Sequence, residues 1–176
     1  MATGSSLLVS FTRIKQLEAK RRKMHNTIPV QIKILRTING KSPLPVYATD
    51  GSAAFDFYAA TNRLEVIDPG KTFFVPTGIS IWIRDPSKAL LILPRSGLGC
   101  KNRIVPANTP GLLDADYQNE VIVCLTNMSD DVFRFEPGDR IAQGILIPVF
   151  RMEFNVVDEF SAETARTGGF GSTGIK

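Results

Sequence analysis

The chain has 176 residues, 43% hydrophobic and 22% charged, which is typical of one globular domain that can bury a core. Its formal charge of +4 is unevenly placed, because residues 1–27 hold six basic residues and one acidic residue, whereas residues 28–176 hold 15 basic and 16 acidic residues. The only histidine, His25, lies in that leader and there are two cysteines, which excludes a Ser-His-Asp triad, a histidine-rich metal site, a structural zinc site and a disulfide framework from the main domain.

The basic leader, residues 1–27, carries the one helical pattern. Apolar residues recur there at helical spacing, at Leu7, Phe11, Ile14 and Leu17. A solvated tail helix, a membrane-surface or nucleic-acid-binding arm and a transit peptide all fit this pattern, and Met24 offers a second translation start. The chain lacks an apolar run of the roughly 18 residues that a membrane span needs, and it lacks a secretory signal. We therefore expect a cytoplasmic or otherwise intracellular protein, with organelle targeting by the leader left open.

From residue 28 the hydrophobic period changes to two, as in half-buried strands. Short apolar, β-branched runs repeat at residues 28–34, 63–67, 72–75, 79–83, 89–93, 120–126, 132–135 and 141–149. Turn signals such as Pro76-Thr77-Gly78 separate them. Residues 28–160 are therefore predicted to form an all-β domain, a jelly-roll-like distorted β-barrel without a core helix. The glycine-rich residues 161–176 predict a flexible C-terminal arm.

Two polar segments interrupt the strands in a way that indicates a site. Pro94–Gly99 follows an apolar run and offers a guanidinium, a hydroxyl and unhindered backbone N–H groups, which suit phosphate oxygens as well as an ordinary turn. Asn108–Val121 predicts a β-hairpin in which residues 112–113 pair with residues 121–123. Asp114 and Asp116 would then share a strand face, where paired carboxylates suit hydrated Mg²⁺, a general base, or a polar turn.

Two more segments follow. In Gly138–Gln143, an Asp139–Arg140 ion pair is expected, and Gln143 in an apolar strand must bind a backbone group or a ligand. The tail contains a G-x-G-x-x-G match from Gly169, but no strand and helix surround it, so a dinucleotide site is excluded. The tail instead offers an aromatic ring, hydroxyls and Arg166, which could close over a nucleotide.

These segments, in this order, resemble the five motifs of the trimeric dUTP pyrophosphatase (dUTPase) family. The corresponding segments are Ala53–Tyr58, Pro94–Gly99, Asn108–Glu120, Gly138–Gln143 and Gly168–Gly174. The resemblance implies an all-β fold, hydrolysis of dUTP to dUMP and pyrophosphate, and a homotrimer whose active sites are shared between subunits. It also implies Mg²⁺ held through the substrate phosphates and water, with no direct protein ligand.

The resemblance assigns roles to individual residues. The catalytic positions it implies are Asp114, Asp56, Ser96 and Gln143, with Asp114 activating the attacking water. The substrate-binding positions it implies are Arg95, Ser96, Gly97, Asn108, Gly111, Leu112, Leu113, Asp114, Tyr117, Ile122, Arg166, Phe170, Gly171, Ser172 and Thr173. Among these, Tyr117 would pack on the deoxyribose and Phe170 would stack on uracil.

The chain departs from the family pattern at two points. Ala54 stands where the family usually has glycine, and Arg166 lies one position nearer the Gly168-Gly169 pair than usual. Two other functions fit the same scaffold: a regulatory or binding protein, and a dCTP deaminase. The Asp114–Tyr117 pattern argues against a deaminase, because related deaminases lack it and use a glutamate.

Overall fold

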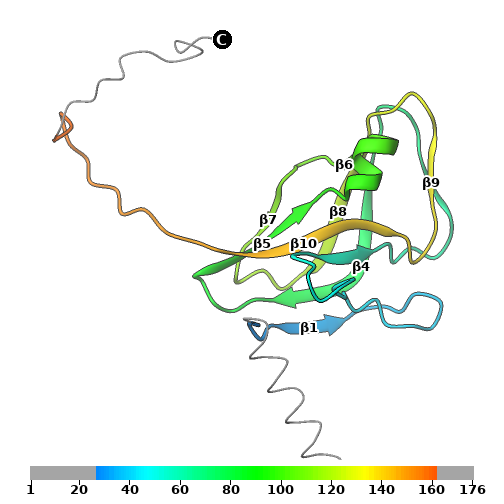
Figure 1. The fold of residues 1–176 in the computed structure, drawn as a ribbon, viewed down its shortest axis with the longest axis horizontal. Helices are drawn as coiled ribbons and strands as arrows, with labels where there is room; N and C mark the ends of the chain where they lie inside the picture. The colour runs from blue at the N-terminus through cyan, green and yellow to red at the C-terminus, as the bar shows by residue number, and fades with distance from the viewer. Residues whose placement is uncertain (1–26, 162–176) are drawn as a thin grey trace, which may run out of the picture.

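The computed structural model describes residues 27–161, and the regular secondary structure within them is almost entirely β-strand (Figure 1). The strands are β1 (Gln31–Ile34), β2 (Phe55–Tyr58), β3 (Glu65–Ile67), β4 (Thr72–Trp82), β5 (Lys88–Leu93), β6 (Ile104–Pro106), β7 (Gly111–Leu113), β8 (Glu120–Asn127), β9 (Phe133–Phe135) and β10 (Arg140–Pro148). One short π-helical turn, η1 (Gly97–Lys101), connects β5 to β6. The all-β prediction is confirmed.

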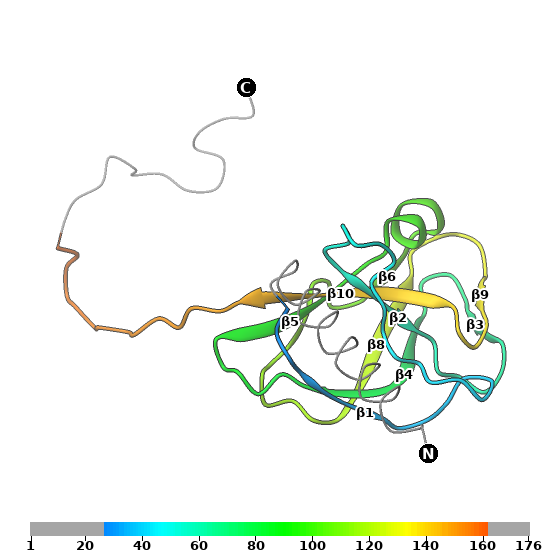
Figure 2. The same cartoon turned by 60° about the horizontal axis from the view of Figure 1, so that its bottom comes forward.

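The strands form two four-stranded sheets and one small ribbon. One sheet has the order β1-β4-β8-β6, the other β2-β10-β5-β7, and β3 pairs with β9. Figure 2 shows β1 beside β4 and β10 beside β2 and β5. All the strand pairs of the larger sheets are antiparallel. From the strand orders, the edge strands in the described part of the chain are β1 and β6 in one sheet and β2 and β7 in the other. Because most neighbours in the sheets are distant in sequence, long-range packing determines which motifs meet.

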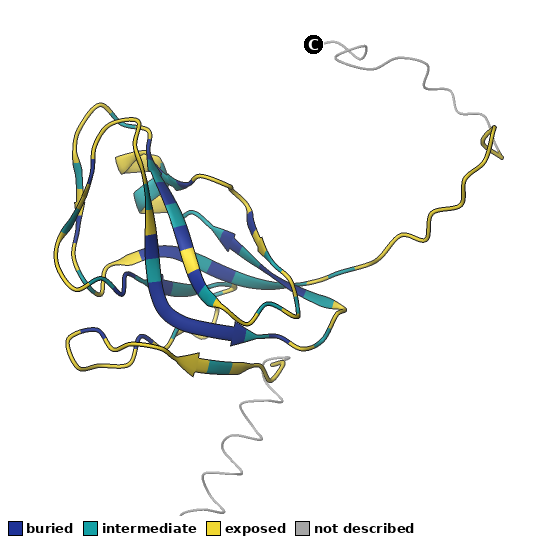
Figure 3. Ribbon diagram, turned by 180° about the vertical axis from the view of Figure 1, so that it is seen from behind, coloured by how far each residue is buried: buried dark blue, intermediate teal, exposed yellow. Residues whose placement is uncertain are grey.

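The core lies between the two larger sheets, where side chains alternate as the period of two requires. On β8, Val121, Val123 and Leu125 are buried, and β4 and β5 contribute further aliphatic residues (Figure 3). The next inward residue of β8, Asn127, is fully buried yet fully bonded: its Nδ2 donates to the carbonyls of Ile67 and Asp131 at 2.8 and 2.7 Å. A buried amide is stable in a core only when bonded in this way.

Two strand predictions need correction. The predicted turn Pro76-Thr77-Gly78 lies inside β4, where the register with β8 shifts between Pro76 and Ser80. Proline and glycine are tolerated there because the irregularity removes the need for regular ladder bonds. The predicted half-buried strand at residues 28–34 shortens to β1, where Ile32 is partly buried but Ile34 is 42% exposed, because β1 is an edge strand.

After β10 the chain runs away from the two sheets as an extended segment, coloured orange in Figure 1. Its large apolar side chains are exposed: Phe150, Met152, Phe154, Val156 and Phe160. In the described part of the chain, no helix is long and apolar enough to cross a membrane. The predicted helix of the leader and the predicted C-terminal arm fall on residues outside the described range, apart from Thr27 and Ser161.

Candidate active site

The first half of the site forms where three strands bring separate motifs together. In the β2-β10-β5 arrangement, Gln143 of β10 lies opposite both Asp56 of β2 and Leu93 of β5. The chain leaves β5 immediately after Leu93, so Pro94 and Arg95 emerge beside Gln143 and Asp56. Three motifs that are far apart in the sequence therefore meet at one corner, which we call the arginine corner and define as Asp56, Arg95, Arg140 and Gln143.

Asp56 organises this corner. Its Oδ1 accepts a hydrogen bond from Arg95 Nε at 2.8 Å, and its Oδ2 accepts one from Arg140 Nη1 at 3.3 Å. Arg95 Nη1 also donates to the Arg140 carbonyl at 3.3 Å. The Asp56 side chain is only 13% exposed, so both oxygens are engaged inside the structure. Two guanidinium groups on one carboxylate leave a net positive charge, which favours an anion.

The neighbouring groups complete an anion-binding surface. Gln143 Nε2 donates to the Pro94 carbonyl at 2.9 Å, so Gln143 binds a backbone group, one of the two expected roles. Ser96 is exposed and makes no capping hydrogen bond to η1, which leaves its hydroxyl free for a ligand. A Cβ at Gly97 would meet nothing within 4 Å, so a ligand can approach this backbone closely.

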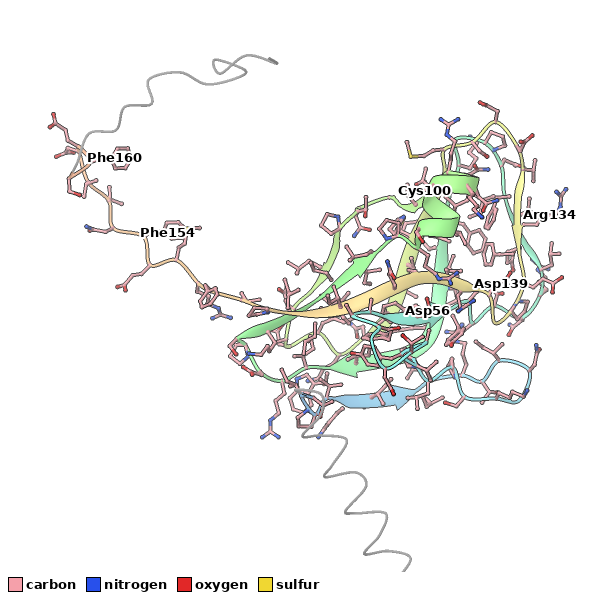
Figure 4. All side chains as sticks on the ribbon, in the orientation of Figure 1. Asp56, Cys100, Arg134, Asp139, Phe154 and Phe160 are labelled. Atoms are coloured by element: carbon pink, nitrogen blue, oxygen red, sulfur yellow. The ribbon has the colours of Figure 1, made fainter. Side chains whose placement is uncertain are left out.

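The expected Asp139–Arg140 ion pair is wrong. Asp139 Oδ2 instead accepts the backbone N–H of Glu136 at 2.8 Å and closes the turn before β10. Arg140 turns to Asp56, a partner that sequence reasoning missed because Asp56 is 84 residues away. Figure 4 shows Asp56 and Asp139 on the same side of the molecule, at the start of β10.

The second half of the site is a cavity of about 190 Å³ between β7 and β8. Its walls include Asn108, Gly111, Leu112, Leu113, Asp114, Tyr117 and Ile122, all predicted substrate-binding positions, together with Ile92, Pro106, Val121, Val123 and Cys124, which the sequence analysis did not single out. Drug-sized ligands occupy pockets of about 300 Å³ or more, so this cavity suits a smaller group such as a single heterocyclic ring. Burial raises the pKa of the Cys124 thiol, because desolvation disfavours the thiolate.

The cavity exists because the predicted hairpin does not form, and that prediction was wrong. Strand β7 pairs with β5, with Gly111 opposite Ile92, whereas β8 pairs with β4 and β6. The two segments therefore diverge into different sheets. In the described part of the chain no strand covers the outer edge of β7, so its backbone groups face the cavity side unpaired. The free N–H and C=O groups of such a strand edge can form hydrogen bonds with a nucleobase in the way that a complementary nucleobase does.

Asp114 follows β7 directly, at the mouth of the cavity. It is exposed, and its carbonyl accepts the Tyr117 N–H at 3.2 Å, so Asp114 to Tyr117 form a turn and not a strand. The predicted shared strand face of Asp114 and Asp116 is therefore not formed. Asp114 also lines a second cavity of about 590 Å³, together with Trp82, Arg84 and Arg151. The carboxylate is thus open to solvent and to ligands from two sides.

The arginine corner and Asp114 do not meet within one chain. Gln143 pairs with Leu93 on one side of β5, whereas Leu113 pairs with Leu90 on its other side. Four residues along β5 and two inter-strand spacings separate Gln143 from Asp114, a distance of about 16 Å between their backbones. One chain therefore presents two separate half-sites. The predicted arm residues Arg166, Phe170, Gly171, Ser172 and Thr173 lie outside the described residues.

Comparison with known proteins identifies the family. The dUTPase family model matches residues 40–174. The chain belongs to the dUTPase family. It is 49% identical over 149 residues to the deoxyuridine 5'-triphosphate nucleotidohydrolase of Shewanella halifaxensis, covering 84% of this chain and 98% of that protein.

Solved dUTPase structures share the fold. The Staphylococcus bacteriophage 80alpha dUTPase with dUpNHpp superimposes with a TM-score of 0.73 at 25% identity, covering 85% of this chain and all of that one. A mutant dUTPase from phage phi11 of S. aureus, described with a coordinated structural Mg(II) ion, superimposes with a TM-score of 0.67 at 19% identity over 76% of this chain and 99% of that one. At the lower identity the likeness concerns the fold alone.

Proposed function

We propose that this chain hydrolyses dUTP to dUMP and pyrophosphate, and so limits uracil incorporation into DNA while supplying dUMP. Its membership of the dUTPase family supports the reaction class. The observation that carries the proposal is the pairing of an anion-binding arginine corner with a ring-sized cavity that has an open backbone edge and a carboxylate at its mouth. Those are the groups that a nucleoside triphosphate hydrolase without histidine needs.

In the proposed reaction Asp114 is the general base. Its exposed carboxylate holds a water, accepts a proton from it and directs the oxygen to the α-phosphorus. The bond from the α-phosphorus to its bridging oxygen breaks, and pyrophosphate leaves. Arg95, Ser96 and Gln143 bind the phosphate oxygens and stabilise the negative charge that develops on them.

The nucleoside occupies the cavity between β7 and β8. Backbone groups from Asn108 to Ile122 bind the uracil edge and reject the amino group of cytosine. Tyr117 packs on the deoxyribose and leaves no room for a 2'-hydroxyl. From the C-terminal arm, Phe170 stacks on uracil while Arg166, Gly171, Ser172 and Thr173 contact the substrate.

The residues present fit Mg²⁺ bound through the phosphates. Each oxygen of Asp56 accepts a hydrogen bond from an arginine, so Asp56 is placed to order the corner around the triphosphate. Among the described residues no cluster of three or more His, Cys, Asp or Glu could hold a metal. Mg²⁺ prefers waters and substrate phosphates to an all-protein cage, and when bound it would offset the negative charge of the triphosphate.

A homotrimer would complete the site. The separation of about 16 Å between the backbones of Gln143 and Asp114 favours an arrangement in which a second copy brings its cavity to the arginine corner of the first. The extended segment after β10 favours such an assembly, because Phe150, Met152, Phe154 and Val156 alternate with polar residues as a strand does, yet are 78 to 94% exposed (Figure 4 places Phe154 on this segment). We propose that the 28–160 domain assembles in this way and that residues 161–176 close the shared site.

Pyrophosphate release from dUTP, dCTP, dTTP and UTP with Mg²⁺ tests the proposal. We expect release from dUTP alone, and its loss in Asp114→Asn, which keeps the shape but removes the base. Asp68→Asn is the matched control, because Asp68 is exposed in the turn between β3 and β4, away from the residues of both half-sites in sequence and outside both cavities. Normal turnover by Asp114→Asn would contradict the assignment, and ammonia release from dCTP would replace it with deamination.

A further inference from the structure

At the register shift in β4, between Pro76 and Ser80, a side chain of β8 supplies the hydrogen-bond acceptor that the regular strand pairing would otherwise provide. Where the register shifts, the Gly78 N–H donates to Glu120 Oε1 at 2.9 Å. The other carboxylate oxygen, Glu120 Oε2, accepts a hydrogen bond from Arg36 Nη2 at 2.7 Å. The Gly78 carbonyl in turn accepts the N–H groups of Leu35 and Arg36 at 2.8 and 3.3 Å. Arg36, Gly78 and Glu120 therefore form a closed ring of contacts, which we call the Glu120 clamp.

Only glycine allows this clamp. Gly78 has φ +72°, and a Cβ there would lie 2.9 Å from both Ala60 Cβ and Arg36 Cγ. Because glycine has no Cβ, the Arg36 side chain can cross the irregular strand and reach Glu120. The Glu120 side chain is 18% exposed and Arg36 is 43% exposed, so the carboxylate is the sheltered partner and the arginine covers it.

The clamp is attached to the turn that carries Tyr117. The Tyr117 hydroxyl donates to the Glu120 carbonyl at 2.7 Å, and Ser80 Oγ donates to the Gln118 carbonyl at 2.6 Å. Tyr117 lines the 190 Å³ cavity. The Tyr117 hydroxyl is thus hydrogen-bonded to the backbone of Glu120. The Glu120 side chain is in turn held by Gly78 of β4 and by Arg36, which follows β1. A displacement of Glu120 would therefore displace Tyr117, which forms part of the cavity wall.

We propose that Glu120, held by Arg36 and Gly78, is a positioning residue that fixes Tyr117 and thereby sets the preference for deoxyribose over ribose. The inference rests on the proposed function, in which Tyr117 packs on the sugar. It concerns the Glu120 side chain, which does not line the cavity and acts through Tyr117. A wall that excludes a single hydroxyl must be placed within a fraction of an ångström, and a turn bonded only to itself is too compliant for that.

Binding of dUMP and UMP by the full-length chain, measured by calorimetry, tests this directly because it needs no catalysis. We expect Glu120→Ala and Arg36→Ala to reduce the ratio of dUMP to UMP affinity roughly 10-fold, the scale on which one small group in a pocket is discriminated. Glu120→Gln keeps an oxygen for the Gly78 N–H and should retain part of the ratio. Arg63→Ala is the control, since it removes an arginine from a comparable exposed ion pair, with Glu65 at 3.4 Å, outside the clamp.

Hydrolysis supplies a second readout. For dUTP we expect Glu120→Ala to raise KM while kcat stays within about threefold, because the reacting atoms are untouched. Variants that lose thermal stability but keep the wild-type affinity ratio would overturn the inference and leave the clamp a structural feature. If Glu120→Ala does not fold, Arg36→Ala and Glu120→Gln decide the matter, since each keeps the Gly78 N–H acceptor.

The outcomes separate the two proposals. A wild-type chain that prefers dUMP but releases no pyrophosphate would refute the proposed hydrolysis, while loss of that preference in the clamp variants would still support the role of Glu120. A wild-type chain that binds dUMP and UMP equally would overturn the inference regardless of hydrolysis.

Discussion

Replacing Asp56 with alanine should damage both stability and turnover. The substitution removes the acceptor of two charged hydrogen bonds, from Arg95 Nε at 2.8 Å and from Arg140 Nη1 at 3.3 Å. A hydrogen bond to a charged group contributes about 1.5–3 kcal/mol. The Arg140 side chain is 48% exposed, so its bond is screened, whereas Arg95 is 26% exposed. We expect the free energy of unfolding to fall by about 2–3 kcal/mol in total.

The effect on catalysis follows from the same contacts. Without Asp56 the two guanidinium groups repel each other and lose their fixed orientation toward the phosphates. A displacement of about 1 Å in a substrate-positioning group costs about 100-fold in rate, so we expect kcat/KM for dUTP to fall by that order. Asp56→Asn keeps one oxygen for Arg95 and should fall between Asp56→Ala and the wild type.

Pyrophosphate release at saturating Mg²⁺ and urea denaturation measure the two effects, with Asp68→Asn as control. A double-mutant cycle with Arg95→Ala should show strong non-additivity, because each single variant already breaks the same contact. The Mg²⁺ concentration for half-maximal activity should stay unchanged, since in the proposed site the phosphates and water hold Mg²⁺ while Asp56 accepts hydrogen bonds from Arg95 and Arg140. Simple additivity, or a large rise in the Mg²⁺ requirement, would refute the reasoning.

Three further predictions concern packing, reactivity and assembly. Gly144→Ala should lower the free energy of unfolding by about 1–3 kcal/mol in urea titrations, because its Cβ would lie 2.7 Å from Phe55 Cζ in a close-packed region. At pH 8 iodoacetamide should label exposed Cys100 before Cys124, whose raised pKa leaves less thiolate; mass spectrometry showing equal rates would contradict this. Phe154→Asp should shift the chain toward smaller species in sedimentation, because a charge replaces an apolar side chain that we expect to be covered by another copy.

The strand pattern of the sequence predicted the larger strands because their periodicity reflects burial on one face. Strand β8 alternates over its whole length, and the predicted 120–126 matches Glu120–Asn127. The strand boundaries predicted from the sequence were wrong where pairing with a neighbouring strand outweighs the local preference for a turn. Pro76 and Gly78 are typical of a turn, yet β4 continues through them, because Thr77 Oγ1 and the Glu120 side chain supply bonds in place of a regular ladder.

The candidate site shows the same division. The resemblance to the family implied Arg95, Ser96 and Gln143 as phosphate ligands, and the structure brings the first and last of these beside Asp56. No local signal could show that Arg140 would choose Asp56 over its neighbour, because that choice depends on the β2–β10 register. The hairpin prediction failed for a related reason: β5 offers residues 111–113 a pairing edge that nearest-neighbour reasoning does not see.

Strand β5 explains why the site is divided. It lies between β10 and β7, so the arginine corner forms beyond its C-terminal end on one flank, while Asp114 is attached toward its N-terminal end on the other. Both flanks are bound to β5 by regular ladders, and its residues Ala89, Leu90 and Ile92 are buried in the core. The two half-sites are therefore connected through one continuous sheet. In the proposed assembly a second copy brings the general base to the phosphate ligands, and the ladders that separate these groups in one chain would hold them in fixed register once the copies assemble.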